Sequence, residues 1–249
     1  MTKTKIETFI KKYSLGNILD VVRWTCKNKV LTVNEITADK KLMVTTNIKN
    51  FDSFRDIEFI IRDTRGLKSK LAILGEEFTI NLISGDENPN RIIAMELEDD
   101  RTTLLVNTGA EGDDKGKKPK LMNIPDYDVE IVLTEQFKTD FSKAKSSFSD
   151  VNLFTLIMSK KKQKLEMVLG YSSNNNTDRV ALSVYPVEGK NTINTPINFS
   201  ADALKEILNA NSEAKDPILK VSEQGLAFIG FSDENFDSQY YLVKIPVED

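Results

Sequence analysis

The chain has 249 residues, of which 40% are hydrophobic and 29% charged, and its formal net charge is −4. This composition is typical of a soluble globular protein with one large domain or two small ones. It contains no histidine and one cysteine, so it lacks the commonest general base and metal ligand, cannot form an intrachain disulfide and is not expected to hold zinc. No apolar run is long enough to span a membrane and the N-terminal MTKTKIETFIKK lacks the apolar core of a signal peptide, so we expect a cytoplasmic protein.

The first predicted helix runs from Lys3 to Tyr13, and Gly16 can stop it. Its apolar residues recur at i, i+3, i+4 and i+7 and form one buried face: Ile6, Phe9, Ile10 and Tyr13. Its lysines, apart from Lys3 at its start, fall on the other sides of the helix: Lys5, Lys11 and Lys12. The pattern therefore predicts a short amphipathic helix with a basic surface.

A second helix is expected from an N-cap at Asp63 or Thr64 to about Leu74. Its buried stripe consists of Leu67, Leu71 and Leu74. Its charged residues are Arg65, Lys68 and Lys70, and no acidic residue lies between Arg65 and Leu74. That is unusual for a helix in an acidic protein.

Short β-rich runs fill the rest of the first half: Ile18–Thr25, Val30–Ile36, Leu42–Ile48, Ile57–Ile61, Phe78–Ile83, Arg91–Leu97 and Arg101–Asn107. We place Cys26 in the polar turn CKNK and interpret it as a structural thiol, because no histidine is present to activate it. Asp99 and Asp100 are interpreted as hairpin-turn residues.

The stretch Ala110–Pro125, AEGDDKGKKPKLMNIP, separates this half from the next. Glycines, lysines and aspartates come first, and a short apolar patch of Leu121, Met122 and Ile124 follows. This composition predicts a connector between two domains.

The second half repeats the order of the first. Thr134 can cap a helix to about Lys145, with Phe137, Phe141 and Ala144 as its apolar stripe and Lys138, Lys143 and Lys145 off that stripe. Ser200 caps a fourth helix, ADALKEILNAN, of mixed charge. The expected strands are Val129–Leu133, Leu153–Met158, Leu165–Leu169, Arg179–Tyr185, Ile218–Val221, Leu226–Phe231 and Tyr240–Ile245.

The first and third helices begin roughly 130 residues apart, as do the second and fourth. We therefore predict an α+β fold of two like domains, each with antiparallel sheets and two short helices. The first domain is expected at residues 1–109, the connector at 110–125 and the second domain at 126–249.

Positive charge gathers on three of the four helices, although the whole chain is acidic. Helices on one side of the sheets would then present a basic face that attracts phosphates without reading bases. No helix-turn-helix, zinc module or aromatic-rich basic loop indicates sequence-specific recognition.

The order of elements, the connector with its KLMNIP and the ending LAFIGFSDENFDSQYYLVKIPVED together resemble a DNA sliding clamp. The likeness is to the clamps of large tailed phages, relatives of the eukaryotic proliferating cell nuclear antigen. It covers the order of elements along the whole chain. The most specific residues are KLMNIP and YYLVKIP.

The resemblance implies a homotrimeric ring that encircles duplex DNA, is opened by a clamp-loader ATPase and tethers the replicative DNA polymerase for processive synthesis. It implies no active site and no cofactor. The DNA-facing residues would be Lys3, Lys5, Lys11, Lys12, Arg65, Lys68, Lys70, Lys138, Lys143 and Lys145. If the protein is phage-encoded, its location would be the host cytoplasm.

Two further sets of residues follow from the resemblance. Subunits would join through the strands Arg101–Thr108 and Arg179–Tyr185, with Leu104, Val106, Val180 and Leu182 in a shared core. A C-terminal peptide of the polymerase would dock in a pocket walled by Leu121, Met122, Ile124, Pro125, Tyr241, Val243, Ile245 and Pro246. One alternative is a non-enzymatic phage structural or scaffold protein with a duplicated β-rich fold. Another is a nuclease whose paired carboxylates bind magnesium.

Overall fold

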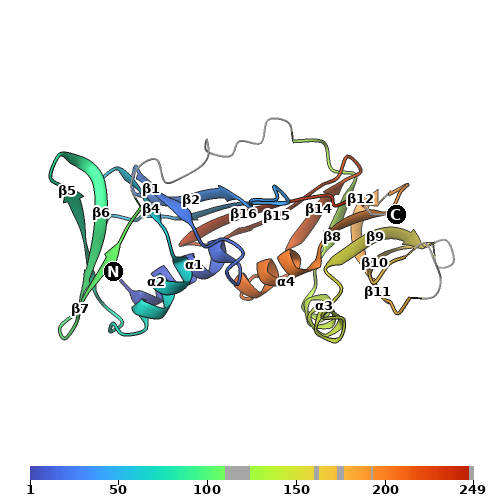
Figure 1. The fold of residues 1–249 in the computed structure, drawn as a ribbon. Helices are drawn as coiled ribbons and strands as arrows, with labels where there is room; N and C mark the ends of the chain where they lie inside the picture. Colours follow the sequence, from blue (N-terminus) through green and yellow to red (C-terminus); the bar gives the residue numbers. More distant parts are fainter. Residues whose placement is uncertain (110–123, 160–162, 173–176, 192, 247–249) are drawn as a thin grey trace. The chain divides into compact units, whose positions relative to one another are not determined.

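The computed structural model describes residues 1–109, 124–159, 163–172, 177–191 and 193–246, and shows an α+β protein of short helices and antiparallel sheets (Figure 1). The chain divides into two compact units. Unit 1 comprises Met1–Ile36, Val44–Pro119 and Ser232–Ser238. Unit 2 comprises Thr37–Met43, Lys120–Phe231 and Gln239–Asp249.

Unit 1 contains helices α1 (Lys3–Ser14) and α2 (Thr64–Leu71), which pack against each other. The predicted stripe of α1 is buried, and the helix ends where Leu15 and Gly16 adopt left-handed conformations with φ of 48° and 65°. The Asp63 side chain caps α2 by accepting a hydrogen bond from the Gly66 N–H at 2.5 Å. α2 ends at Leu71, one turn earlier than the sequence pattern predicts.

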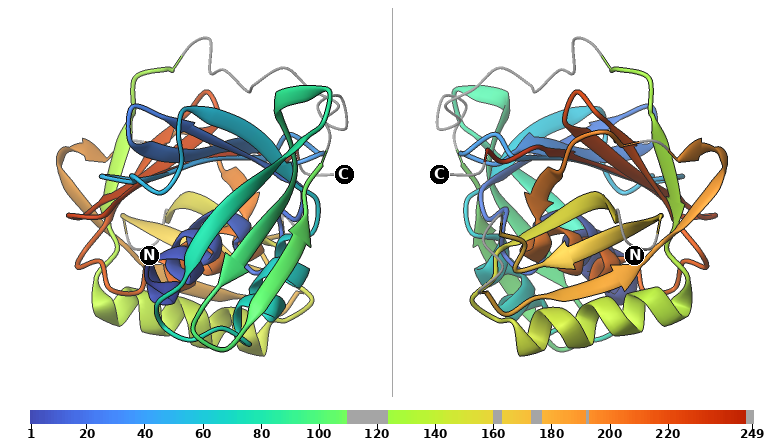
Figure 2. Two further views of the ribbon diagram at one scale, coloured as in Figure 1. Left: turned by 90° about the vertical axis from the view of Figure 1, so that its left-hand side faces the viewer. Right: turned by 90° about the vertical axis from the view of Figure 1, so that its right-hand side faces the viewer.

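The sheets of unit 1 are antiparallel. One has the strand order β3-β2-β1-β4, and the other has the order β5-β6-β7 (Figure 2, left). The strands are β1 (Val22–Lys27), β2 (Val30–Ile36), β3 (Leu42–Ile48), β4 (Ile57–Ile61), β5 (Thr79–Gly85), β6 (Asn88–Glu98) and β7 (Thr103–Asn107). Phe9, Trp24 and Phe59 form an aromatic centre in which the Phe9 and Trp24 ring centroids lie 5.6 Å apart.

Unit 2 contains helices α3 (Glu135–Ser147) and α4 (Ala201–Ala210), also packed together. The predicted caps are present, because Thr134 accepts from the Phe137 N–H and Ser200 accepts from the Ala203 N–H. One sheet has the order β11-β10-β9-β13 (Figure 2, right) and the other strands follow the order β12-β8-β14-β15-β16. These strands are β8 (Val129–Val132), β9 (Leu153–Ser159), β10 (Lys164–Leu169), β11 (Val180–Ser183), β12 (Tyr185–Asn191), β13 (Ile197–Ser200), β14 (Ile218–Ser222), β15 (Leu226–Ser232) and β16 (Phe236–Val243).

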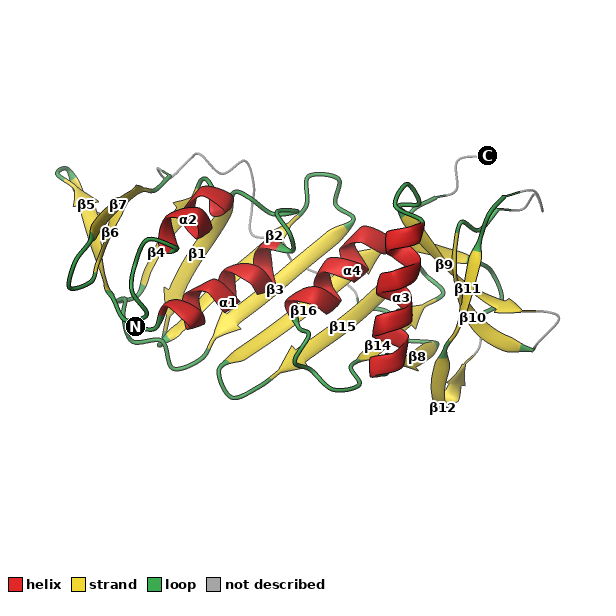
Figure 3. Ribbon diagram, turned by 90° about the horizontal axis from the view of Figure 1, so that it is seen from below, coloured by secondary structure: helices red, strands yellow, loops and turns green. Residues whose placement is uncertain are grey.

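The two units repeat one design. The order β3-β2-β1-β4 matches β11-β10-β9-β13, and β5-β6-β7 matches β14-β15-β16. In each unit the helix pair covers one face of the sheets (Figure 3). The predicted fold class, two like halves with antiparallel sheets and two short helices each, is therefore confirmed. The predicted domain boundaries remain predictions, because residues 110–123 lie outside the described part of the chain.

Several predicted elements differ from the observed ones. The first strand was expected at Ile18–Thr25 but runs from Val22 to Lys27, so Cys26 is a strand residue. The turn falls instead at Asn28 and Lys29, both with positive φ, as a two-residue hairpin requires. Strands β12 and β13 were not predicted. Pro186 and Gly189 lower the strand propensity of β12, and β13 is only four residues long.

Candidate functional site

Half of the ten basic residues expected to face DNA have exposed side chains. They lie on α1, α2 and α3, and they are Lys11, Arg65, Lys68, Lys70 and Lys143. No hydrogen bond or ion pair ties these five side chains to another residue in the described part of the chain. They are therefore available to an external anion.

Two of the ten are buried, which corrects the expectation that all of them lie free on the surface. Lys12 is 1% exposed and its Nζ lies 5.6 Å from the centre of the Phe236 ring. Lys145 is 4% exposed, and its Nζ pairs with Asp202 at 2.9 Å and donates to the Ser149 carbonyl at 3.0 Å. Both lysines were expected off the apolar stripe. Lys145, however, follows Phe141 by four residues and so lies beside the buried face of α3, and neighbouring elements cover both lysines.

The remaining three, Lys3, Lys5 and Lys138, are partly buried and bound to backbone oxygens. The Lys3 Nζ donates to the Leu74 carbonyl at 2.8 Å, and the Lys5 Nζ donates to the Lys49 carbonyl at 3.5 Å. The Lys138 Nζ donates to the Ala214 carbonyl at 2.8 Å and pairs with Glu135. Their positive charge is retained, but these side chains have little freedom to follow a ligand.

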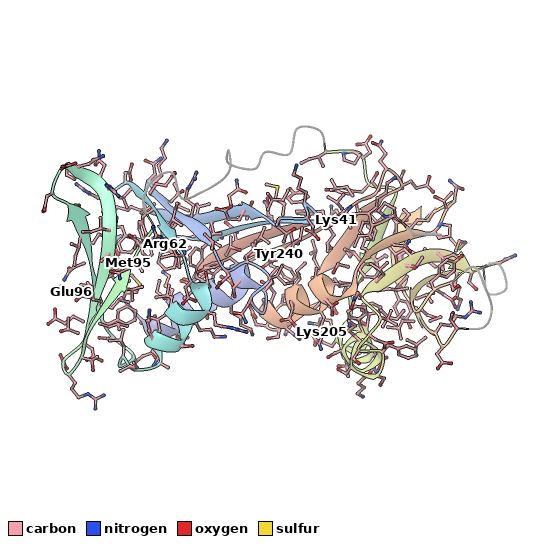
Figure 4. The ribbon with its side chains drawn as sticks, viewed as in Figure 1. Lys41, Arg62, Met95, Glu96, Lys205 and Tyr240 are labelled. Carbon is pink, nitrogen blue, oxygen red and sulfur yellow. The ribbon has the colours of Figure 1, made fainter. Side chains whose placement is uncertain are left out.

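A cavity of about 410 Å³ lies between α3 and α4 in unit 2. Three lysines line it: Lys138, Lys143 and Lys205. Lys205 was not predicted because α4 has mixed charge in the sequence, yet it projects on the helix side of unit 2 (Figure 4). Packing of α4 against α3 thus adds a cation to the basic set.

Strands β7 and β11 each lie at the edge of a sheet, as expected for the subunit-joining strands. Just before β7 the Asp99 N–H donates to the Thr102 carbonyl, and just after it the Thr108 N–H donates to the Ile93 carbonyl. Hydrogen-bonded and non-hydrogen-bonded pairs alternate along an antiparallel ladder. Since Glu96 is opposite Leu105, the Leu105 N–H and C=O therefore point away from β6, toward the open edge.

The same alternation applies to β11. The Val184 N–H donates to the Leu165 carbonyl, and the register places Val168 opposite Ala181 and Glu166 opposite Ser183. The backbone groups of Ala181 and Ser183 therefore point toward the open edge, and both residues are exposed. β7 in unit 1 and β11 in unit 2 therefore each present alternate backbone groups toward an open edge.

The four expected interface side chains are not equivalent. Val106 is 6% exposed and already packs in its own sheet, whereas Leu104, Val180 and Leu182 are half-buried. Leu105 points to the opposite face of the sheet from Val106 and is 57% exposed. Burial of Val106 leaves the other three side chains to form any shared core.

The expected partner pocket is only partly within the described residues, because Leu121 and Met122 lie outside them. Tyr241 instead packs against Phe228, which in turn packs against Tyr127, and neither of these two residues was predicted from the sequence. The Phe228 ring lies 4.9 Å from that of Tyr241 and 6.2 Å from that of Tyr127, between centroids. We call Tyr127, Phe228 and Tyr241 the aromatic patch.

Gly230 makes room for the centre of this patch, since a Cβ atom there would lie 2.9 Å from the Phe228 Cζ. Burial and the neighbouring Tyr241 raise the pKa of Tyr127 to about 12, and burial raises the pKa of Tyr241. Tyr241 is only 8% exposed, so Tyr127 and Phe228, which are half-buried, form most of the accessible part of the patch. Successive side chains of a strand point to opposite faces of its sheet. Applied to Leu226–Phe231, this alternation could have predicted that Phe228 lies on the face opposite Ala227 and Ile229.

The other expected pocket residues are accessible to different degrees. Ile124 is 53% exposed, Pro246 is exposed, and Pro125, Val243 and Ile245 are half-buried. Lys41 lies beside the same end of β16: the Val243 N–H donates to the Lys41 carbonyl at 2.9 Å, and the Lys41 Nζ donates to the Lys244 carbonyl at 3.5 Å. The segment before β3 therefore adjoins the C-terminal side of this surface.

The described residues lack two further structural features. They include no helix long and apolar enough to cross a membrane. Among the same residues, no group of three acidic or cysteine side chains is placed to hold a metal ion.

Comparison with known proteins identifies the fold. A solved structure, the crystal structure of proliferating cellular nuclear antigen from Entamoeba histolytica, matches with a TM-score of 0.69 and 15% sequence identity. The match covers 98% of this chain and 96% of that one. No protein-family model matches, and a search of curated proteins finds no significant match. The chain therefore has the sliding-clamp fold of proliferating cell nuclear antigen.

Proposed function

We propose that the chain is the subunit of a ring that encircles duplex DNA and tethers a replicative DNA polymerase. The observation that carries this proposal is the combination, in a clamp fold, of free cations on the helices with two unlike open strand edges. The proposal assigns the chain no catalytic activity and no cofactor.

The basic helices suit contact with DNA that slides. Lys11, Arg65, Lys68 and Lys70 in unit 1 and Lys143 in unit 2 are exposed and unpaired within the described residues, and Lys205 adds to them. Lysine and arginine attract phosphates at any sequence. Weak contacts of this kind retain the duplex without holding the ring at one position.

The two edges suit a closed ring. A head-to-tail interface joins two different surfaces and closes when the rotation between subunits allows it. β7 would pair with β11 of the next subunit, and three subunits would complete a homotrimer. In this proposal Leu104, Val180 and Leu182 form the shared core of the interface. Val106 is buried within its own sheet.

For partners, we propose that the C-terminal peptide of the polymerase docks on the aromatic patch together with Ile124, Pro125, Val243, Ile245 and Pro246. A clamp-loader ATPase would use the same surface. KLMNIP in the connector and YYLVKIP at the end of the chain ally the protein with clamps of large tailed phages. Leu121 and Met122 belong to this proposal by sequence alone.

Mass and topology test the proposal together. Light scattering of the purified protein is expected to give a mass near three times 28.1 kDa. After loading, the protein is expected to stay on closed circular DNA and to leave the same DNA once it is cut. A monomer that stays on neither DNA would favour the structural-protein alternative, and DNA cleavage with magnesium would favour the nuclease.

A further inference from the structure

A second concave site lies entirely within unit 1, apart from the helices and from the aromatic patch. It is a cleft of about 490 Å³ between the β1–β4 pair and the start of β6. Cys26, Ile57 and Ile92 contribute its apolar floor, and each is less than 10% exposed. Clefts of this volume with an apolar floor and a few polar groups are the usual form of ligand sites.

Gly109 closes one end of the cleft. Its N–H donates to the Ile60 carbonyl at 2.7 Å. A Cβ atom at this position would lie 2.8 Å from the Ile60 Cβ, so only glycine allows this approach. The chain leaving β7 is therefore joined to β4 at the edge of the cleft.

The acidic side chains of the cleft already have partners. Glu58 pairs with the Arg23 Nε at 3.2 Å and accepts from the Thr25 hydroxyl at 3.1 Å. Asp56 accepts from the Asn28 N–H at 3.0 Å. Each carboxylate keeps further lone pairs that can accept hydrogen bonds from a ligand.

Two basic side chains of the cleft have no such partner. Lys27 ends β1 on one wall and Arg91 lies in β6 on the other. Both are exposed, and neither makes a hydrogen bond or an ion pair with any residue that the structure describes. The cleft therefore offers a positive charge from each of two walls.

We propose that this cleft binds a short acidic peptide segment of a partner protein. Two carboxylates of the segment would pair with Lys27 and Arg91, and an apolar side chain between them would rest on the floor. The peptide's N–H groups would donate to Asp56 and Glu58. A nucleic-acid strand fits less well. Its phosphates would lie close to those same two carboxylates, and its backbone has no N–H group that could donate a hydrogen bond to them.

The proposal is independent of ring formation and of DNA binding, and is tested on the purified full-length protein. A library of random dodecapeptides is selected on the protein, and enriched peptides are labelled with fluorescein and titrated by anisotropy. We expect enriched peptides with at least two Asp or Glu residues. Their affinity should fall at least tenfold in the double variant Lys27→Glu with Arg91→Glu, and with rising salt.

Matched variants locate the binding. The double variant Lys40→Glu with Lys215→Glu carries the same charge change at exposed positions outside the cleft and should bind as the wild type does. Ile245→Ala, on the other proposed docking surface, should also leave the affinity unchanged. Lys27→Gln with Arg91→Gln is a milder form of the test should the charge reversal unfold the protein.

Three results would overturn the proposal. The first is selection of no acidic peptide. The second is acidic peptides that lose affinity in Ile245→Ala and keep it in the cleft variants. The third is a dodecathymidine that binds as tightly as the peptides and loses affinity in the cleft variants to the same degree, which would assign the cleft to nucleic acid.

Discussion

Lys145 on α3 and Asp202 in the first turn of α4 form an ion pair with 2.9 Å between Nζ and Oδ1, although only 4% of the lysine side chain is exposed. The lysine joins the two helices of unit 2 instead of facing outward. Lys145 thus links α3 to α4, whereas the nearby Lys143 on the same helix is exposed and available for external contacts.

Lys145→Ala is expected to destabilise the protein by about 1–3 kcal/mol, because it removes a buried donor and the packing of the lysine stem. Asp202 is half-exposed, and solvent limits the cost of leaving it unpaired. Urea denaturation would measure the change. Lys143→Ala is the matched control on the same helix and should shift stability by no more than about 0.5 kcal/mol. Equal stability of the two variants would contradict a structural role for Lys145.

Reversing exposed helix cations should weaken retention on DNA. The triple variant Lys11→Glu, Lys68→Glu and Lys143→Glu removes three unpaired charges and no described internal contact. We expect faster loss from circular DNA as salt is raised, because fewer phosphates are neutralised. Lys12→Met retains the stem of a buried lysine and should not change retention. A triple variant retained like the wild type at every salt concentration would remove these residues from the DNA-facing set.

Leu105→Pro should weaken the ring while leaving the subunit folded. The Leu105 N–H points toward the open edge of β7, so proline removes an edge donor without removing a bond to β6. Light scattering over a dilution series should show dissociation at higher concentration than in the wild type. Leu105→Ala keeps the N–H and separates the backbone effect from the side chain. Leu104→Pro breaks the bond to Leu97 and should unfold the β5–β6–β7 sheet instead.

The aromatic patch should govern binding of a polymerase C-terminal peptide. Phe228→Ala removes the ring that contacts both Tyr127 and Tyr241, and loss of one buried aromatic anchor costs about 2 kcal/mol or more of binding energy. Calorimetry should show that the affinity for the peptide falls at least tenfold, while light scattering shows that the mass of the assembled trimer is unchanged. Ile124→Ala with Ile245→Ala should have a similar effect. Wild-type affinity in both variants would place the docking site elsewhere.

Asp99 links stability to pH in the turn that leads into β7. Hydrogen bonds from the N–H groups of Gly75, Arg101 and Thr102 hold the pKa of Asp99 below its usual range, and Arg101 adds a favourable charge. A lowered folded-state pKa contributes stability above the usual value of about 3.9, and that stability is lost as the pH falls through the folded-state value. Asp99→Asn should therefore flatten the acid limb of a stability profile measured by thermal unfolding. An unchanged limb would show that these bonds do not favour the ionised form.

Local patterns in the sequence were sufficient to predict several features of the fold. The spacing of Ile6, Phe9, Ile10 and Tyr13 determined the buried face of α1, and Thr134 and Ser200 determined the starts of α3 and α4, because a helix period and a side-chain cap depend on neighbours only. The duplication could also be inferred from the order of elements, whereas the two edge strands were expected only from the resemblance to sliding clamps. Strands whose sequences have low strand propensity were not predicted. β12, which contains a proline and a glycine, is an example.

Only the tertiary structure decided which basic residues are free, which aromatics meet and where concave sites lie. Lys12 and Lys143 look alike in sequence, yet the Phe236 ring covers one and solvent surrounds the other. Tyr127, Phe228 and Tyr241 come from three separate segments of the chain. Lys27 and Arg91 line one cleft because β4 lies against β6 and the chain leaving β7 is joined to β4 at Gly109. Such relationships depend on contacts between residues distant in the chain, which no local period or propensity encodes.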